Sequence, residues 1–188
     1  MNLPKQRQNG AGASPTQEEM PILIGLGANL PSGRGTPAQT LCAALDRLAE
    51  QGLTVLRRSR FWRSPPWPPS DQPWYVNAVA SVSTTLPPDD LLAALHRVEA
   101  EFGRERSVPN AARPIDLDLL AYRGEIRRGP DLILPHPRLT ERAFVLLPLA
   151  EIAAMWCHPV TDATIAALIA VLPADHMAEP IEEGNARR

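Results

Sequence analysis

The chain has 188 residues, a mass of 20.5 kDa and a formal net charge of −2, which is the size of a single domain. Its two cysteines, Cys42 and Cys157, are too few for a disulfide framework or a four-thiolate zinc site. A net charge so near zero argues against a general nucleic-acid binder, and no apolar run reaches the roughly 18 residues of a membrane helix. Because the N-terminus also lacks the apolar core of a signal peptide, we expect a cytoplasmic protein without nucleic-acid or membrane partners.

The basic residues are 18 arginines and a single lysine, Lys5. A P-loop requires Gly-Lys-Ser/Thr, and no such tripeptide is present. A Schiff-base mechanism would have to use Lys5, which lies in a polar segment without periodicity. If this protein handles phosphates, we expect it to use arginine side chains, backbone amides and metal ions.

The two ends of the chain differ in composition from its middle. Residues 1–20 are polar and show no hydrophobic period, which predicts a mobile tail, and residues 174–188 are expected to form a second one. Residues 21–173 then make up the one predicted domain.

Within this domain, strands and helices alternate along the chain. Apolar runs and alternating patterns predict strands over residues 21–27, 53–64, 75–85 and 114–122. Helical periodicity predicts helices over residues 36–51, 88–102 and 161–172, with a hairpin arm over 125–134 and short helical turns, interrupted by Pro148, over 138–152. The order β-α-β-β-α-β predicts an α+β protein with a ferredoxin-like core and C-terminal additions.

Asp116 and Asp118 are the strongest candidates for chemistry. In a strand, residues two apart point to the same face, so both carboxylates would lie together while Leu117 and Leu119 point to the core. Two close carboxylates repel each other unless a cation lies between them, and carboxylate oxygens suit magnesium shared with substrate phosphates. The alternative interpretation is a solvated polar strand face paired with nearby arginines, and the spacing alone leaves both open.

Several further residues could bind an anion or a flat ring. Arg104, Arg106 and Arg113 precede the aspartates, and guanidinium groups match phosphate oxygens, although ordinary surface arginines would look the same. A proline-rich segment over residues 64–73 leads into Tyr75 and Asn77, which share one face of the next predicted strand. An aromatic ring and an amide on one face can stack on, and hydrogen-bond to, a flat heterocycle.

Taken together and in this order, the segments GLGANL, RSPPWPPSDQPWYVNAV, VEAEFGRER, RPIDLDLL and LPHPRLTERAFVLLPL resemble the 6-hydroxymethyl-7,8-dihydropterin pyrophosphokinase family. The resemblance covers about residues 22–159. It implies an enzyme of folate biosynthesis that moves the diphosphoryl group of ATP to the pterin hydroxymethyl group and releases AMP. Because 188 residues leave no room for a second folate-pathway domain, we expect a monofunctional enzyme. The resemblance also implies ATP as co-substrate, two magnesium ions, small-molecule partners only and a monomeric state.

The resemblance further implies roles for individual residues. Asp116 and Asp118 would hold both magnesium ions, and together with Arg104 and Arg113 they would be the catalytic residues. The residues implied to bind ATP are His96, Glu99, Arg104, Arg106, Arg113, His136 and Arg142. The residues implied to bind the pterin are Ser64, Pro65, Trp67, Tyr75, Asn77 and Phe144.

The chain departs from the family pattern at residues 108–112. The family often has a tryptophan and another basic residue shortly before the arginine that matches Arg113, whereas this chain has Val-Pro-Asn-Ala-Ala. We expect Trp67 to supply the missing aromatic surface. Two alternatives remain at this level: a magnesium-dependent phosphohydrolase or nuclease that uses Asp116 and Asp118, and a non-catalytic module whose proline-rich loop docks a partner.

Overall fold

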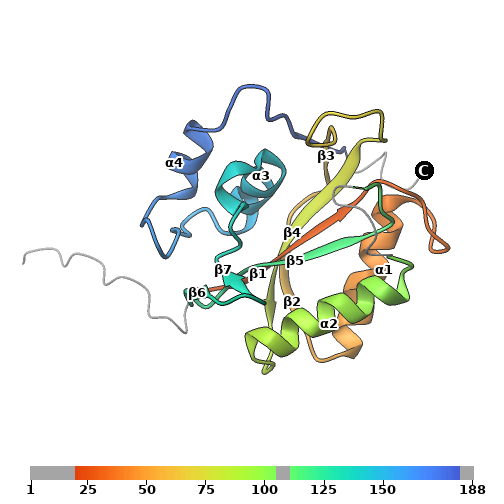
Figure 1. Cartoon of the computed structure of the whole chain (residues 1–188), viewed down its shortest axis with the longest axis horizontal. Coiled ribbons are helices and arrows are strands. Elements are labelled where there is room, and N and C mark those ends of the chain that lie inside the picture. The colour runs from red at the N-terminus through yellow and green to blue at the C-terminus, as the bar shows by residue number, and fades with distance from the viewer. Residues whose placement is uncertain (1–19, 105–110, 183–188) are drawn as a thin grey trace, which may run out of the picture.

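A computed structural model of the chain describes residues 20–104 and 111–182. It is a mixed structure in which helices pack on both faces of one antiparallel sheet (Figure 1). The strands are β1 Ile22–Ala28, β2 Thr54–Arg58, β3 Trp62–Ser64, β4 Tyr75–Ser83, β5 Asp116–Tyr122, β6 Arg127–Arg128, β7 Ile133–Leu134 and β8 Glu179–Pro180. The helices are α1 Pro37–Glu50, α2 Pro88–Glu101, the 3-10 turn Leu139–Glu141, α3 Ala143–Ile152 and α4 Ile165–Ala170.

The main sheet has the strand order β5-β1-β4-β3-β8, and β2 also pairs with β4. All its pairings are antiparallel. The predicted second strand is divided into β2 and β3, which pair with opposite ends of β4. Between them Ser59 keeps contact with β4, because its backbone amide donates to the Val79 carbonyl and its hydroxyl accepts from the Val79 amide. The predicted hairpin arm is the small sheet of β6 and β7.

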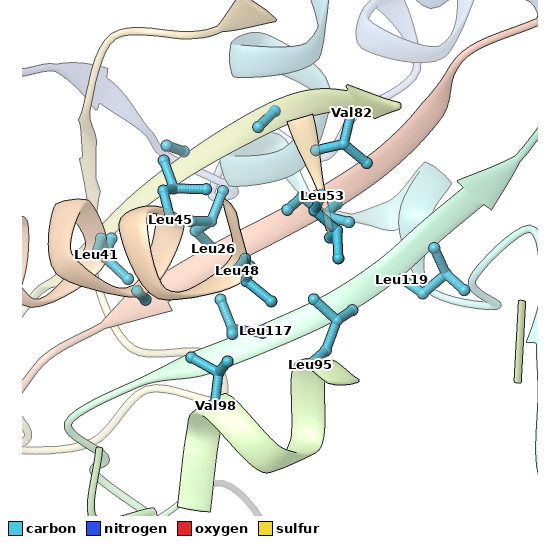
Figure 2. Packing of buried hydrophobic residues seen from close by; sticks show 14 of the residues in the cluster. Leu26, Leu41, Leu45, Leu48, Leu53, Val82, Leu95, Val98, Leu117 and Leu119 are labelled. Atoms are coloured by element: carbon cyan, nitrogen blue, oxygen red, sulfur yellow. The ribbon is translucent and has the colours of Figure 1, made fainter. Parts of the chain in front are cut away.

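The first helical layer, α1 and α2, covers one face of the sheet. The Thr36 hydroxyl accepts from the Gln39 amide and the Gln39 side chain accepts from the Thr36 amide, and these two bonds form a capping box at the start of α1. Leucines of α1 and α2 pack on leucines of β1 and β5 in a single cluster (Figure 2). Leu117 and Leu119 belong to this cluster, so β5 turns its apolar side chains to the helices as predicted.

The second helical layer consists of α3 and α4, which pack on the opposite face of the sheet. The predicted interruption at Pro148 is wrong, because α3 runs through this residue. A proline inside a helix removes one backbone hydrogen bond, but Leu146 and Leu149 on either side are completely buried against the sheet. Their burial keeps the helix continuous.

The predicted C-terminal tail is partly wrong. Residues 174–182 are described, and β8 within them pairs with β3 at the edge of the main sheet. The Ile181 amide donates to the Phe61 carbonyl over 2.8 Å, and the Ile181 side chain packs against the core. The segment is too short and polar to show a strand pattern, so no local pattern predicts this pairing. The predicted N-terminal tail, apart from Met20, and residues 183–188 lie outside the described residues.

None of the helices in residues 20–104 and 111–182 has the length and apolar character needed to cross a membrane.

Candidate active site

A cavity of about 730 Å³, partly open to solvent, lies on the sheet face that α3 covers only in part. Its floor is formed by β1, β4 and β5, and its walls by the proline-rich loop and the start of α3. One end carries Arg113, Asp116, Asp118 and Arg142, and the other carries the aromatic and amide side chains predicted to bind a flat ring. A single space therefore joins the two groups of residues that the sequence singled out.

The two aspartates are held at the cavity by the register of β5 and β1. Asp116 and Asp118 face the cavity, and their partners across the strand pair are Gly27 and Gly25. A Cβ atom at Gly27 would lie 3.4 Å from Asn77 Oδ1 and 3.7 Å from Asp116 Cβ. The absence of a side chain at Gly27 thus keeps open the space between the carboxylates and the amide, a role that the sequence analysis did not assign to it.

Each carboxylate is paired with arginine. Asp116 Oδ1 lies 2.5 Å from Arg104 Nη1, and Asp116 Oδ2 lies 3.1 Å from Arg113 Nη1. Asp118 Oδ2 lies 3.5 Å from Arg142 Nη1. These ion pairs are mostly shielded from solvent, with side-chain exposures between 16% and 34%. Pairing with arginine, the alternative that the sequence left open for these aspartates, is therefore present, but at the wall of a cavity and not on an open surface.

Burial raises the pKa of Asp116 to about 6, and repulsion from the Asp118 carboxylate adds to the rise. Arg113 and Arg104 oppose this shift without cancelling it. Burial also lowers the pKa of Arg142, against the attraction of Asp118. The charged groups at this end therefore do not fully stabilise one another. A bound cation or anion can stabilise them further, and this favours its binding.

Nothing in the described ranges forms a group of three or more His, Cys, Asp or Glu side chains able to hold a metal by themselves. Two carboxylates at the wall of a cavity nevertheless fit magnesium, which keeps several waters and takes its remaining ligands from substrate phosphates. The buried Nε of Arg142 has no hydrogen-bond partner in the structure, which leaves a cationic donor available to a phosphate oxygen. The donor set suits a magnesium-bound polyphosphate.

Glu99 and His96, predicted to lie near a nucleotide, do not line the cavity. Glu99 is only 1% exposed, accepts from the Leu117 amide over 2.7 Å and pairs with Arg104. Glu99 therefore links α2 to β5 and to Arg104. His96 is half-buried on α2.

His136 is likewise not among the residues that line the cavity. Its backbone amide donates to the Leu120 carbonyl over 2.8 Å, and its Nδ1 accepts from the Arg138 amide. Burial lowers the pKa of His136, although Asp118 works in the opposite direction. Arg106, the remaining predicted phosphate ligand, lies outside the described residues.

All six residues predicted to bind a pterin line the cavity: Ser64, Pro65, Trp67, Tyr75, Asn77 and Phe144. Asn77 is 4% exposed, and its Nδ2 donates to the Ser64 hydroxyl over 3.0 Å. This bond orients the amide so that Oδ1 lies over Gly27, towards the cavity. A buried acceptor held in this way can read a donor on the edge of a flat heterocycle.

Asn29 is a residue that the sequence analysis missed. It is 2% exposed; its Oδ1 accepts from the Arg113 amide over 2.8 Å, and its Nδ2 donates to Gln72 Oε1 and to the Pro73 carbonyl. Asn29 therefore ties the segment that carries Arg113 to the proline-rich loop. Its only sequence signal is its place directly after a buried strand, which is too common to single it out.

The segment where the chain departs from the family pattern is described only at Ala111 and Ala112, so residues 108–110 lie outside the described part. Trp67, expected to replace the missing aromatic surface, lines the cavity and meets the His176 ring at a centroid distance of 4.5 Å. Its action over bound substrate stays a prediction.

The chain is similar to known proteins over most of its length. Residues 23–154 match the model of a family described as 7,8-dihydro-6-hydroxymethylpterin-pyrophosphokinase. The chain is 44% identical over 131 residues to the 2-amino-4-hydroxy-6-hydroxymethyldihydropteridine pyrophosphokinase of Methylorubrum extorquens, which covers 69% of this chain and 80% of that protein. It is 38% identical over 160 residues to the folic acid synthesis protein fol1 of Pneumocystis carinii, which covers 85% of this chain and 21% of that protein.

Among solved structures, the chain resembles the Plasmodium falciparum HPPK-DHPS wild type with SDX-DHP, with a TM-score of 0.62 and 13% identity. The match covers 78% of this chain and 43% of that one, and at this identity it supports the fold alone. The chain thus spans about four fifths of the bacterial relative and about a fifth of the Pneumocystis protein.

Proposed function

The chain belongs to the 7,8-dihydro-6-hydroxymethylpterin-pyrophosphokinase family, and from this we propose that it transfers the β,γ-diphosphoryl group of ATP to the hydroxymethyl oxygen of 6-hydroxymethyl-7,8-dihydropterin in folate synthesis. The observation that carries the proposal is the single cavity that joins Asp116, Asp118 and their arginines to Tyr75, Asn77 and Phe144. One end suits a metal-bound polyphosphate, and the other suits a flat heterocycle with a polar edge.

In this reaction the hydroxymethyl oxygen bonds to the β-phosphorus of ATP, and the bond from that phosphorus to the oxygen bridging it to the α-phosphorus breaks. AMP leaves with the bridging oxygen, and the hydroxyl proton is released. Phosphoryl transfer of this kind depends mainly on positioning and charge neutralisation, so no strong general base is required. The proposed catalytic residues are Arg104, Arg113, Asp116 and Asp118.

We assign the binding of two magnesium ions to Asp116 and Asp118. When bound, they would neutralise charge on the triphosphate and orient it. Arg104, Arg113 and Arg142 pair with these carboxylates in the structure described here, and we propose that they turn to phosphate oxygens once ATP is bound. His136 and Arg106 would support the same end of the cavity.

At the other end, Tyr75 and Phe144 would hold the pterin ring between them, with Asn77 Oδ1 accepting from its polar edge. Ser64 would keep the Asn77 amide in this orientation, and Pro65 and Trp67 would close the cavity along the proline-rich loop. These roles rest on the shared cavity and on the hydrogen bond between Asn77 and Ser64.

We also propose that the core follows the ferredoxin-like plan. With β2 and β3 counted as one divided strand, the element order is β-α-β-β-α-β, and the fourth strand lies beside the first in the sheet. We further propose a monomer that works in the cytoplasm. Two plant relatives are named as mitochondrial, so location is to be checked by cell fractionation and mass by light scattering.

The test is incubation of the chain with ATP, magnesium chloride and 6-hydroxymethyl-7,8-dihydropterin, with AMP and the diphosphorylated pterin measured together. We expect one AMP for each pterin product and no turnover when the pterin is omitted. ATP consumption without pterin would instead support the phosphohydrolase alternative, which the relatives described above do not support. Binding without any turnover would contradict the enzyme assignment.

A further inference from the structure

The segment of residues 174–182, here called the C-terminal strap, lies next to the proline-rich loop in space although it is about a hundred residues away in the chain. The strap is attached at its end by the pairing of β8 with β3 and by the hydrogen bond from the Ile181 amide to the Phe61 carbonyl. At its start, His176 Nδ1 lies 2.7 Å from the Glu141 carbonyl oxygen. Because a carbonyl can only accept, Nδ1 carries the hydrogen and donates it.

The strap contacts Trp67 within the proline-rich loop and Arg63 of β3, directly before that loop. The His176 ring meets the Trp67 ring edge-on, with centroids 4.5 Å apart and an interplanar angle of 63°. Glu179 pairs with Arg63 Nη2 over 3.0 Å, and the Arg63 guanidinium lies 5.4 Å from the centre of the Trp74 ring. Arg63 and Glu179 are about half exposed, so we give their pair little weight, and the contact with Trp67 is the stronger link.

Trp67 stands between two cavities. It lines the candidate active site on one side and, on the other, a second cavity of about 400 Å³ whose far wall is formed by Asp175, His176 and Met177 of the strap. Pro65, Arg142 and Phe144 also line both cavities. The Trp67 ring is therefore part of the wall of the active-site cavity, and His176 is the strap residue whose ring contacts it.

We propose that the C-terminal strap is a positioning element of the active site, and that the His176 ring holds Trp67 at the wall of the pterin end. This inference rests on the proposed function. Without the His176 ring, Trp67 can move into the space of the second cavity, and the loop loses the wall against which the pterin binds. His176 itself touches no substrate in this account.

The experiment compares His176→Ala with a matched control, His158→Ala. The His158 ring also meets a tryptophan edge-on, Trp156, at a centroid distance of 5.9 Å, but Trp156 belongs to the core under α3 and not to the cavity. Pterin affinity is measured by titration calorimetry with a non-hydrolysable ATP analogue and magnesium present. We expect His176→Ala to raise the pterin dissociation constant about two- to tenfold, the range for loss of one aromatic pair, and His158→Ala to leave it unchanged.

Two conservative variants separate the ring contact from the hydrogen bond to Glu141. His176→Phe keeps a ring beside Trp67 and loses the donor, whereas His176→Gln keeps a donor and loses the ring. We expect His176→Phe to retain the pterin affinity of the unmodified protein and His176→Gln to lose it. If circular dichroism shows that His176→Ala is unfolded, the comparison of His176→Phe with His176→Gln tests the proposal in its place.

Steady-state kinetics provide a second readout. If His176 positions Trp67, His176→Gln should have a higher KM for pterin and an unchanged KM for ATP and kcat. Equal losses of affinity for pterin and for nucleotide would overturn the proposal, as would an unchanged pterin affinity in the variants. It would also be overturned if His176→Gln kept the pterin affinity and His176→Phe lost it. The unmodified protein is assayed in parallel. If it forms no AMP, the proposed function fails; if it does and the His176 variants match it, only the role of the strap fails.

Discussion

At the scale of single residues, Asp116 and Asp118 have the same side chain but different surroundings. Asp116 pairs with two arginines, whereas Asp118 has one arginine at 3.5 Å and a larger exposed fraction. Burial raises the pKa of Asp116 to about 6, and the neighbouring Asp118 carboxylate adds to the rise. A charge held in this way costs folding free energy until a cation offsets it.

This cost predicts a pH-dependent gain in stability for Asp116→Asn without magnesium. A carboxyl whose pKa is raised on folding, from 3.8 to about 6, favours the folded state at low pH, and this contribution is lost as pH rises through about 6. At pH 8 we expect the free energy of unfolding of Asp116→Asn to exceed that of the unmodified protein by up to about 3 kcal/mol. This difference should vanish below about pH 4. Urea unfolding at pH 8, 6 and 4, with EDTA present, measures it.

The same variant should lose turnover at every pH, because a neutral amide cannot replace a magnesium-binding carboxylate. Magnesium and nucleotide together should reduce its advantage in stability, since they stabilise only the unmodified protein. A variant that is less stable than the unmodified protein at pH 8, or equally active, would contradict this account of Asp116.

Asn77 gives a second prediction at this scale. Its Oδ1 is oriented by the bond from its Nδ2 to Ser64, so Asn77→Ala removes the acceptor whereas Ser64→Ala removes only its support. We expect Asn77→Ala to weaken pterin binding by roughly 1–3 kcal/mol and Ser64→Ala to weaken it by less, with nucleotide affinity nearly constant in both. Calorimetric titration of each variant with pterin and with an ATP analogue makes the comparison. Equal losses in the two variants would show that Oδ1 does not read the pterin edge.

The sequence could predict those site residues whose chemistry shows in a local pattern. Alternation along one strand placed Asp116 and Asp118 on a shared face, and the same argument placed Tyr75 and Asn77. Asn29 and Gly27 could not be found in this way, because their roles depend on which strands and loops become neighbours. Glu99 was placed near a nucleotide, yet its buried contact with the Leu117 amide appears only once α2 lies against β5.

At the scale of elements, Glu99 joins α2 to β5 at the strand that carries both aspartates. It is almost completely buried, accepts from the Leu117 amide and pairs with Arg104, which in turn contacts Asp116. Glu99→Gln keeps an acceptor for the amide but removes the charge that holds Arg104. We expect it to lower the free energy of unfolding by about 1–3 kcal/mol and to reduce kcat, because Arg104 loses its anchor.

Chemical denaturation and steady-state kinetics on Glu99→Gln check this prediction. Glu50→Gln is the control, since Glu50 pairs with Arg47 on the exposed side of α1, where ion pairs contribute little. If Glu99→Gln behaves like the control in both measurements, the link between α2 and β5 does not depend on this charge.

The elements that the sequence misplaced share one physical cause. The second strand was predicted as one piece, α3 as interrupted and residues 174–182 as a tail, and in each case packing overrides the local signal. Pro148 stays helical because its neighbours are buried. Residues 179–180 form β8 because they pair with the edge of β3. The elements that were placed correctly, such as α1 with its capping box, carry their own boundaries in the chain.

At the scale of the whole molecule, the two faces of the sheet serve different purposes. The face under α1 and α2 is filled by a continuous apolar cluster, while the opposite face is filled under α3 and hollow beside it. A ligand that fills the hollow would contact β4, β5, the proline-rich loop and the start of α3 at once, so its binding should stabilise the whole fold. Because the carboxylate end and the aromatic end are separate, nucleotide and pterin should contribute to that stabilisation in different ways.

We therefore predict that removal of magnesium separates the two contributions. A ligand that binds only the folded state at a hundred times its dissociation constant stabilises it by about 2.7 kcal/mol, which raises Tm by several degrees for a chain of this size. With magnesium present, an ATP analogue and a non-reactive pterin should each raise Tm. With EDTA, the shift from the analogue should largely disappear, because Asp116 and Asp118 then repel the triphosphate, while the pterin shift persists. Asp118→Asn should show the same pattern with magnesium present, and loss of both shifts together would mean that the two ends of the cavity do not bind independently.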